Sequence, residues 1–266
     1  VLTEEMREVR FAGNAAGFSD CLGIEVLFMD QISELDLQLT KEQLNNIKES
    51  FTESSKFENS PILMVGFNRR FSSLVTRAKR SLATNIPISI SYTCNAGYIP
   101  HDSWVHDPKK GGGRIVGEAC HFIDLCTYLT GSRVQKVCMN AMHKNPKQNT
   151  DNASLLLKYD NGSNVVINYF SNGSKAYSKE RIEVFASKRT LILDNWRKLT
   201  GYGFKNFNQI KSKQDKGHYN QFKELLEQEK SGGSSIIPFD EIINTTRTTL
   251  FAIKSLKTSS WVDINN

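Results

Sequence analysis

The sequence predicts an α+β fold: a large, mostly antiparallel open sheet with helices packed on one face, preceded by a remnant of a Rossmann-type α/β domain. Six segments in the middle of the chain alternate apolar and polar residues with the period of half-buried strands. Segments with helical periodicity lie before and after them. A short continuous apolar run, residues 61–67, has the pattern of a strand covered on both faces.

The N-terminal region, residues 1–30, contains two strand-like stretches, VRFAG around position 10 and IEVLFMD at 24–30. Gly13 and Gly17 lie between them, where a dinucleotide-binding fold has its glycine-rich loop. Only six residues, 18–23, separate Gly17 from the second stretch, too few for the usual helix. This region is therefore either a shortened nucleotide fold or an unrelated N-terminal hairpin. A truncated or misassembled reading frame would explain it equally well.

The run PILMVGF, at 61–67, must pair with other strands, because an inner strand without neighbours exposes apolar side chains and unpaired backbone groups. The partner is the 24–29 strand, another chain, or residues outside this sequence. A helix is expected over 39–54, with Thr40 as N-cap and Gln43 as its capping-box partner. Further helices are expected at 71–83, 218–230 and 238–257.

The main sheet is predicted from turns as well as from alternation. The Asn-Gly pairs of DNGS (160–163) and SNGS (171–174) predict hairpin turns, so the four strands between 154 and 195 should form an antiparallel meander. Such a sheet can present one face to helices and the other to solvent or a partner. The basic stretch 205–218 is predicted to be a solvated loop. The strands are expected at 87–95, 134–142, 154–160, 163–170, 181–187 and 190–195, with a short last strand at 261–264.

Composition narrows the class of protein. The 266 residues are 39% hydrophobic, and no apolar run approaches the ~20 residues of a membrane span. The N-terminus lacks the apolar core of a signal peptide, and the five cysteines form no CxxC pair, so a cytoplasmic protein is expected. The net charge is +6, but the basic residues are dispersed, which argues against nucleic-acid binding.

The stretch GGGRIVGEACHFIDLCTYLTG, residues 111–131, contains glycines that run into an apolar helix. On a helical wheel, one stripe from Ile115 to Leu129 forms the packing face. His121 and Asp124 share another face, about 120° away, where a carboxylate at i+3 could orient an imidazole for acid–base chemistry. The alternative is a surface histidine with an acidic neighbour. The wheel alone does not decide between them.

The loop HDSWVHD, residues 101–107, lies just before this helix. The five-residue spacing of His101 and His106 matches no standard metal-ligand signature, so no metal site is expected. Trp104 could stack on a sugar or form part of a lid. It could equally pin the loop to the sheet.

Much of the chain, about 39–264, resembles the Gfo/Idh/MocA family of NAD(P)-dependent oxidoreductases. The resemblance is carried by PILMVGFNRRFS, by the segment from NAGYIP to the GGG helix, by KERIEVFASKRTLILDN and by the terminal helices. It is most similar to the branch fused behind a zinc-type alcohol dehydrogenase domain in bacteria. The resemblance implies that residues 1–85 are an incomplete remnant of a nucleotide fold with connecting helices. It also implies that residues 86–266 form an α+β domain that binds substrate and forms a homo-oligomer through its open sheet.

The resemblance also implies roles for individual residues. His121 matches the acid–base histidine, and Asp124 the acid one turn on that helps to orient it. The segment Gly66–Phe71 matches the part of the family fold that passes beneath the cofactor. The implied substrate-binding residues are Arg69, Trp104, His106, Asp107, Gly112 and Gly113, and the implied cofactor-binding residues are Phe67, Asn68, Gly13 and Gly17.

The chain departs from the family pattern at two points. The family's full nucleotide domain is not visible in residues 1–38, and the position of its site lysine falls on Leu35, which carries no charge. The resemblance therefore implies an oxidoreductase acting on a sugar or polyol with NAD or NADP, in which this chain is mainly the substrate and oligomerisation domain, doubtful in cofactor binding and inactive alone. The alternative is a non-catalytic sugar-binding or assembly module that has lost its cofactor.

Overall fold

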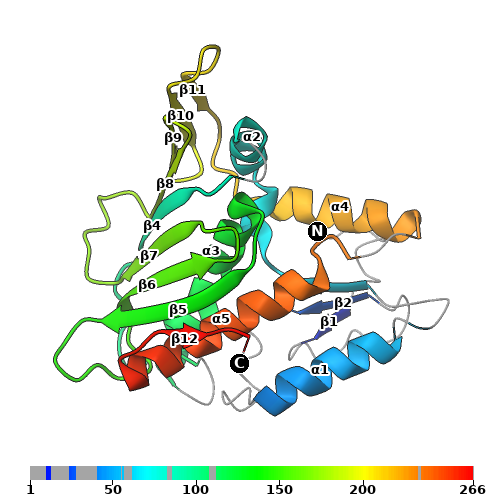
Figure 1. Ribbon diagram of the computed structural model, residues 1–266, viewed down its shortest axis with the longest axis vertical. Helices are drawn as coiled ribbons and strands as arrows, with labels where there is room; N and C mark the ends of the chain where they lie inside the picture. The colour runs from blue at the N-terminus through cyan, green and yellow to red at the C-terminus, as the bar shows by residue number, and fades with distance from the viewer. Residues whose placement is uncertain are drawn as a thin grey trace.

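The computed structural model describes residues 10–12, 24–27, 41–54, 56, 62–82, 86–107, 112–232 and 235–265, without the side chains of 10–12, 24–27, 41–43 and 54. Two sheets organise these residues (Figure 1): a small three-stranded sheet and a nine-stranded sheet in the order β11-β10-β9-β8-β4-β7-β6-β5-β12. None of the helices in the described ranges is both long and apolar enough to span a membrane.

The small sheet consists of β1 (Arg10–Ala12), β2 (Ile24–Leu27) and β3 (Ile62–Val65), paired in parallel in that order. Parallel pairing of β1 with β2 excludes the hairpin interpretation, because a hairpin requires antiparallel strands. The pairing of β3 with β2 confirms one of the three partners expected for the 61–67 strand. The positions of Gly13, Gly17, Leu35 and Thr40 lie outside the described residues.

Helices α4 (His218–Lys230) and α1 (Lys41–Ser54) lie on either side of the small sheet in Figure 1. Leu225 of α4 packs with Ile62 and Met64 of β3 in one buried cluster. Phe51 of α1 stacks on Phe239 at the start of α5 with ring centroids 4.1 Å apart. These contacts join the N-terminal elements to the last helices of the chain.

The nine-stranded sheet has all its neighbouring strands antiparallel except β4 and β7, which are parallel. Its alternating residues are buried on the face that meets the helices, as the sequence predicts. The strands are β4 (Ser89–Asn95), β5 (Val134–Ala141), β6 (Asn152–Tyr159), β7 (Asn164–Phe170), β8 (Glu180–Ala186), β9 (Arg189–Asp194), β10 (Lys198–Tyr202), β11 (Gln209–Lys211) and β12 (Val262–Asp263).

The predicted meander is wrong at one point, because β4 is inserted between β7 and β8. The segment after Phe170 therefore does not form a hairpin; it crosses the end of β4 to reach β8 at Glu180. Asn95, at the end of β4, holds this crossing by donating from Nδ2 to the backbone oxygen of Ser174 at 2.7 Å. The predicted loop 205–218 is also partly wrong, since it contains strand β11.

Helices α3 (Arg114–Thr130) and α5 (Phe239–Thr258) cover the inner face of the sheet, and α2 (Ser73–Ser81) lies beside β9 and β10. Two short 3₁₀ helices complete the fold: η3 (Asn68–Phe71) links β3 to α2, and η4 (Trp104–His106) precedes α3. The residues of η3 contact both α3 and α4. At this junction between the two sheets, Arg70, Asp124 and Glu180 are at most 5% exposed.

Candidate functional site

The 3₁₀ helix η3 presents two consecutive arginines to two different carboxylates. Arg69 binds Glu180 of β8, with Nε 3.0 Å from Oε2. Arg70 binds Asp124 of α3, with Nε 2.9 Å from Oδ2 and Nη2 2.5 Å from Oδ1. A single turn thus connects β8 and α3 through buried, charge-assisted hydrogen bonds.

Glu180 is the centre of the first charged cluster. Its carboxylate accepts hydrogen bonds from Arg69, from Lys216 Nζ at 2.9 Å and from the hydroxyl of Tyr92, and its side chain is only 1% exposed. Burial alone would raise the pKa of Glu180, but the positive charges of Arg69 and Lys216 and their hydrogen bonds outweigh it and lower that pKa to about 2. Glu180 is therefore ionised at neutral pH. We name the set of Arg69, Tyr92, Glu180 and Lys216 the Glu180 cluster.

His121 lies beside the Glu180 cluster on α3. Its ring is partly buried, and the ring of Phe67 meets it edge-on with centroids 5.8 Å apart. Burial and the positive charges of Arg69, His218 and Lys216 lower the pKa of His121 to about 3, while Glu180 acts in the opposite direction. His121 is therefore a neutral imidazole at neutral pH. Its buried Nδ1 has no hydrogen-bond partner among the described residues, so no neighbour there fixes its tautomer.

Asp124 does not lie on an exposed face of α3, and the helical-wheel expectation is wrong in this respect. Its side chain is fully buried, because η3 and α5 both pack against α3 on that side. Its described hydrogen bonds go to Arg70 rather than to His121, and Arg70 also binds Glu241 of α5 at 2.9 Å. Burial raises the pKa of Asp124 to about 6 against the opposing effect of Arg70. Through Arg70, Asp124 thus joins α3 to η3 and α5.

A loop just before α4 brings Lys216 to the Glu180 cluster. Asn68 donates from Nδ2 to the backbone oxygen of Lys216 at 2.7 Å. Gly217 has φ +90°, and a Cβ there would lie 2.2 Å from the backbone oxygen of Asn68 and 2.5 Å from the nitrogen of Ser72. Glycine is thus required for this close approach. The same approach places His218 where its charge acts on His121.

The other residues expected to bind substrate precede His121 in the chain, at the start of α3 and in the loop before it. Trp104 is 59% exposed, whereas His106 is 5% exposed with its Nε2 unpartnered among described atoms. The loop closes on itself, since Gly112 N–H donates to Asp107 at 2.9 Å and Gly113 N–H donates to Val105 at 3.0 Å. Gly113 precedes His121 by eight residues, or about 12 Å along the helix. The structure thus places Arg69 where its charge acts on His121, and it places the 104–107 loop at the start of α3.

Gly113 itself has a structural requirement. Its φ is +85°, and a Cβ would lie 3.1 Å from atoms of Asn149, whose Nδ2 also donates to the backbone oxygen of His106 at 2.9 Å. The glycine allows the 104–107 loop, Asn149 and the start of α3 to approach closely.

Two residues expected to contact a cofactor lie at the carboxyl end of β3. Phe67 is fully buried, and Asn68 is 4% exposed with its amide donated to the Lys216 backbone. Both side chains are thus engaged within the protein, and these two residues do not fit a dinucleotide contact. No group of three or more His, Cys, Asp or Glu residues suited to a metal ion occurs in the described ranges.

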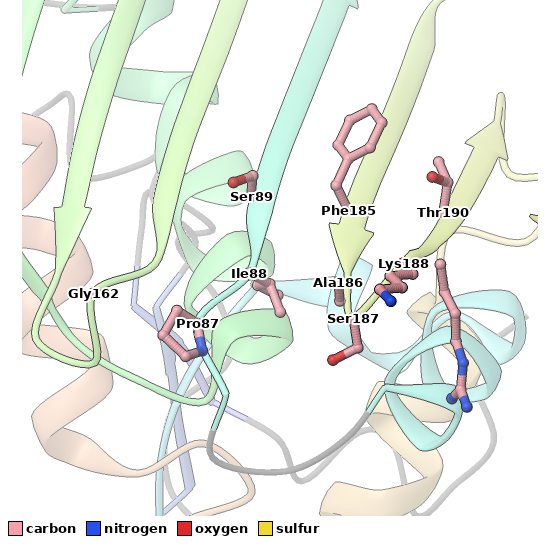
Figure 2. A pocket seen from close by; sticks show the side chains of 10 residues that line it. Pro87, Ile88, Ser89, Gly162, Phe185, Ala186, Ser187, Lys188 and Thr190 are labelled. Carbon is pink, nitrogen blue, oxygen red and sulfur yellow. The ribbon is translucent and has the colours of Figure 1, made fainter. Parts of the chain in front are cut away.

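Two surface hollows lie elsewhere. The larger, of about 520 Å³, is lined by the start of β4 and the β8–β9 turn, including Ser187, Lys188 and Arg189 (Figure 2). The other, of about 300 Å³, includes Met142 and Phe170 at the opposite end of the sheet strands. Neither is lined by His121 or by the Glu180 cluster.

Sequence analysis missed Glu180, Lys216 and Arg70. A signal for Glu180 was present, because alternation places it on the same inward face as Ile182 and Val184. A carboxylate at an inward position requires a cationic partner. No local pattern identified Lys216, because its role depends on contacts with residues 36 and 148 positions away.

Comparison with known proteins identifies one sequence match and a set of structures with the same fold. Residues 87–192 match the model of the GFO/IDH/MocA C-terminal domain. No curated protein sequence matches the chain.

Solved structures share the fold over most of the chain. A probable dehydrogenase from Thermotoga maritima is 20% identical with a TM-score of 0.66, covering 91% of this chain and 73% of its own. An NAD binding oxidoreductase from Klebsiella pneumoniae is 16% identical with a TM-score of 0.70, covering 91% and 73%. The super-repressor mutant of Gal80p from Saccharomyces cerevisiae is 15% identical with a TM-score of 0.70, covering 91% and 72%. The chain thus resembles the GFO/IDH/MocA C-terminal domain in sequence over residues 87–192, and it shares its fold with these solved structures over most of its length.

Proposed function

We propose that this chain is the substrate-side part of an NAD(P)-dependent oxidoreductase that acts on a hydroxyl group of a sugar or polyol. The observation that carries the proposal is His121, a neutral and partly exposed imidazole held beside a buried cluster of charges, whose buried Nδ1 has no hydrogen-bond partner among the described residues. The family match and the fold shared with oxidoreductases support the reaction class.

The chemistry proposed for these residues is binding of the hydroxyl and exchange of its proton. A neutral imidazole can accept the hydroxyl hydrogen, and a proton taken from the hydroxyl would reside on the ring. The Arg70–Asp124 pair holds α3 in place, so His121 has a fixed position relative to a bound substrate. Because Phe67 and Asn68 are committed to packing, the proposed role ends at the substrate and its proton, and the chain alone does not turn over.

The second candidate function is a non-catalytic sugar-binding or assembly module. The burial of Phe67 and Asn68 favours it, as does the fold shared with Gal80p, a protein described as a repressor mutant rather than as an oxidoreductase. In this case His121 would bind a sugar hydroxyl without transferring its proton in a reaction.

One titration tests the absence of cofactor binding and the substrate class that the two functions share. The full chain is titrated with NADH and NADPH while nicotinamide fluorescence is followed, and a parallel thermal-shift assay uses sorbitol, myo-inositol and glucose. Sugar binding without saturable nicotinamide binding agrees with both functions and excludes a chain that works alone as a dehydrogenase; activity after addition of a complete nucleotide-binding domain, lost in His121→Ala, then supports the substrate-side proposal over the non-catalytic module. Saturable micromolar binding of NADH would contradict both the half-site proposal and the cofactor-free module. If no sugar gives a shift, the substrate class is wrong.

We also propose that the open face of the large sheet pairs with a second copy of the chain. Leu156, Phe170 and Phe185 are 38%, 36% and 46% exposed, and all three point away from the helices. Exposed apolar side chains on a broad sheet are characteristic of an interface between subunits.

A further inference from the structure

The Glu180 cluster has more positive than negative charge. Arg69 and Lys216 are both cationic partners of the single carboxylate of Glu180. Tyr92 is neutral, since burial raises its pKa well above the ordinary value. His121 is also neutral, so the cluster has one positive charge in excess.

The carboxylates around the cluster are engaged by other groups. Arg70 binds Asp124 of α3 and Glu241 of α5. Asp215, next to Lys216 in the chain, accepts hydrogen bonds from Ser73 and from the backbone N–H of Gly217. His218, which faces His121 from α4, has its pKa lowered first by burial and then by Arg69 and Lys216, and it contributes no negative charge. Hydrogen bonds from Ser73 and Gly217 outweigh burial and lower the pKa of Asp215, so it is ionised and its charge acts on His218; the excess positive charge is that of Arg69 and Lys216 over Glu180.

Lys216 is the member of the cluster that a ligand can reach. Its side chain is 24% exposed, against 12% for Arg69 and 1% for Glu180. Glu180 holds the ammonium from one side, while Asn68 and the Gly217 contact fix the backbone. An ammonium group has three N–H donors, and one is directed to Glu180. The nitrogen is therefore held in place before a ligand binds, and its remaining N–H groups can turn toward an anion.

We propose that the site takes an acidic sugar, a sugar or polyol with one carboxylate or phosphate group, whose anion is received by Lys216 while a hydroxyl meets His121. This inference rests on the proposed function, since it specifies the substrate class of the same site. The anion would neutralise the excess charge, and the hydroxyl would supply a partner for the imidazole. A neutral polyol would supply only the second contact.

Binding of the anion also has a consequence for His121. The charge of Lys216 is one of those that repel a proton from the imidazole. A bound anion would offset that charge, and the pKa of His121 would rise. The acidic group of the substrate would thus make His121 a better proton acceptor when substrate is present.

The experiment measures dissociation constants of the full chain by thermal shift and calorimetry at constant ionic strength. Gluconate, glucuronate and glucose 6-phosphate are compared with sorbitol and glucose, and sodium acetate and inorganic phosphate test for binding of the anion alone. We expect at least one acidic sugar to bind about tenfold or more tightly than its neutral counterpart, the effect of one charge-assisted contact. The carboxylate and phosphate arms identify which anion the site prefers.

Variants locate the binding. Lys216→Met should abolish the preference for the acidic sugar, and Lys216→Arg should retain part of it. Lys188→Met is the matched control, because Lys188 lines the 520 Å³ hollow and offers a competing basic surface. We expect Lys188→Met to bind like the wild type.

Three outcomes would overturn the inference: equal affinity for acidic and neutral sugars, an acidic preference that survives Lys216→Met, or one that is lost in Lys188→Met. The inference would also be overturned if NADPH displaced the acidic sugar from the wild type but did not bind Lys216→Met, because Lys216 would then bind the cofactor. If neutral and acidic sugars bind equally well, the proposed function stands and only this inference is wrong. If no sugar binds, both the inference and the proposed function are wrong.

Discussion

Arg70 and Asp124 form a fully buried bidentate pair, with hydrogen bonds of 2.9 and 2.5 Å. We expect Asp124→Ala to lower the free energy of unfolding by about 3–5 kcal/mol, because it leaves the buried Arg70 with only the partly exposed Glu241. Urea denaturation measures the loss. Asp160→Ala, which removes an exposed carboxylate, is the control and should change stability by less than about 0.5 kcal/mol. An equally small effect of Asp124→Ala would show that the pair does not hold α3 to η3.

Acid should destabilise the protein first through His121. The unfolded imidazole takes a proton below pH 6.5, whereas the folded one resists it to about pH 3, so stability is complete above pH 6.5 and is lost as the pH falls. Glu180, with its pKa lowered from 4.5 to about 2, adds a further loss only below pH 4.5. Denaturation curves between pH 7 and 5 therefore exclude the contribution of Glu180, and comparison with a variant separates His121 from Asp124 and from His218, whose pKa is also lowered.

The matched variant is His121→Gln, which cannot titrate. Asp124 titrates in both proteins, so its contribution cancels in the difference between them. We expect the wild type to lose about 1–2 kcal/mol more than His121→Gln between pH 7 and 5. Parallel curves for the two proteins would show that His121 is not held neutral.

The Gly217 contact should tolerate no side chain. Gly217→Ala would place a Cβ 2.2 Å from the backbone oxygen of Asn68, and we expect a loss of at least about 2 kcal/mol. Gly232→Ala is the control for the positive φ alone, because Gly232 has φ +67° and a Cβ there would meet nothing within 4 Å. The difference between the two variants, measured by chemical denaturation, gives the cost of the contact. Equal losses would mean that only backbone conformation matters at residue 217.

The open sheet face should determine the oligomeric state. Leu156→Lys combined with Phe185→Lys places two charges on the proposed interface, and we expect the molar mass from light scattering to fall to that of the monomer. Tyr219→Lys, at a 76% exposed position on α4, is the control and should leave the assembly unchanged. If the wild-type chain is already a monomer, the proposal that the open sheet face pairs with a second copy is wrong.

The elements that depend on local pattern could be predicted from the sequence. Alternation located the strands of the large sheet through β9, and helical periodicity located α1, α3, α4 and α5 to within a few residues. The insertion of β4 between β7 and β8 could not be read in this way. It depends on a parallel pairing of residues 75 positions apart, and the SNGS segment has the composition of a hairpin turn without forming one.

In the site too, local pattern could be predicted from the sequence and long-range contacts could not. The sequence pointed to the helix that carries His121, because glycines, a histidine and an acid are conspicuous in an apolar segment. It gave Asp124 the wrong neighbour, because a helical wheel treats the helix as packed on one side only. In the fold, η3, α5 and the sheet surround α3, and the long-range contacts of Arg70 and Arg69 decide which acid is structural and which lies beside the histidine.

The imidazole of His121 is neutral in the free protein and lies beside the positively charged Glu180 cluster, where we propose that an acidic sugar binds. The most direct test is the NMR titration of the imidazole protons in the full chain. The chain has five histidines, and the signal that is missing in the His121→Gln variant is that of His121. We predict that His121 stays unprotonated to below about pH 4 in the free protein. A saturating acidic sugar should move its signals and raise its pKa, while NADH leaves it unchanged. A free His121 that titrates near pH 6.5, or one that responds to NADH but not to any sugar, would contradict the account.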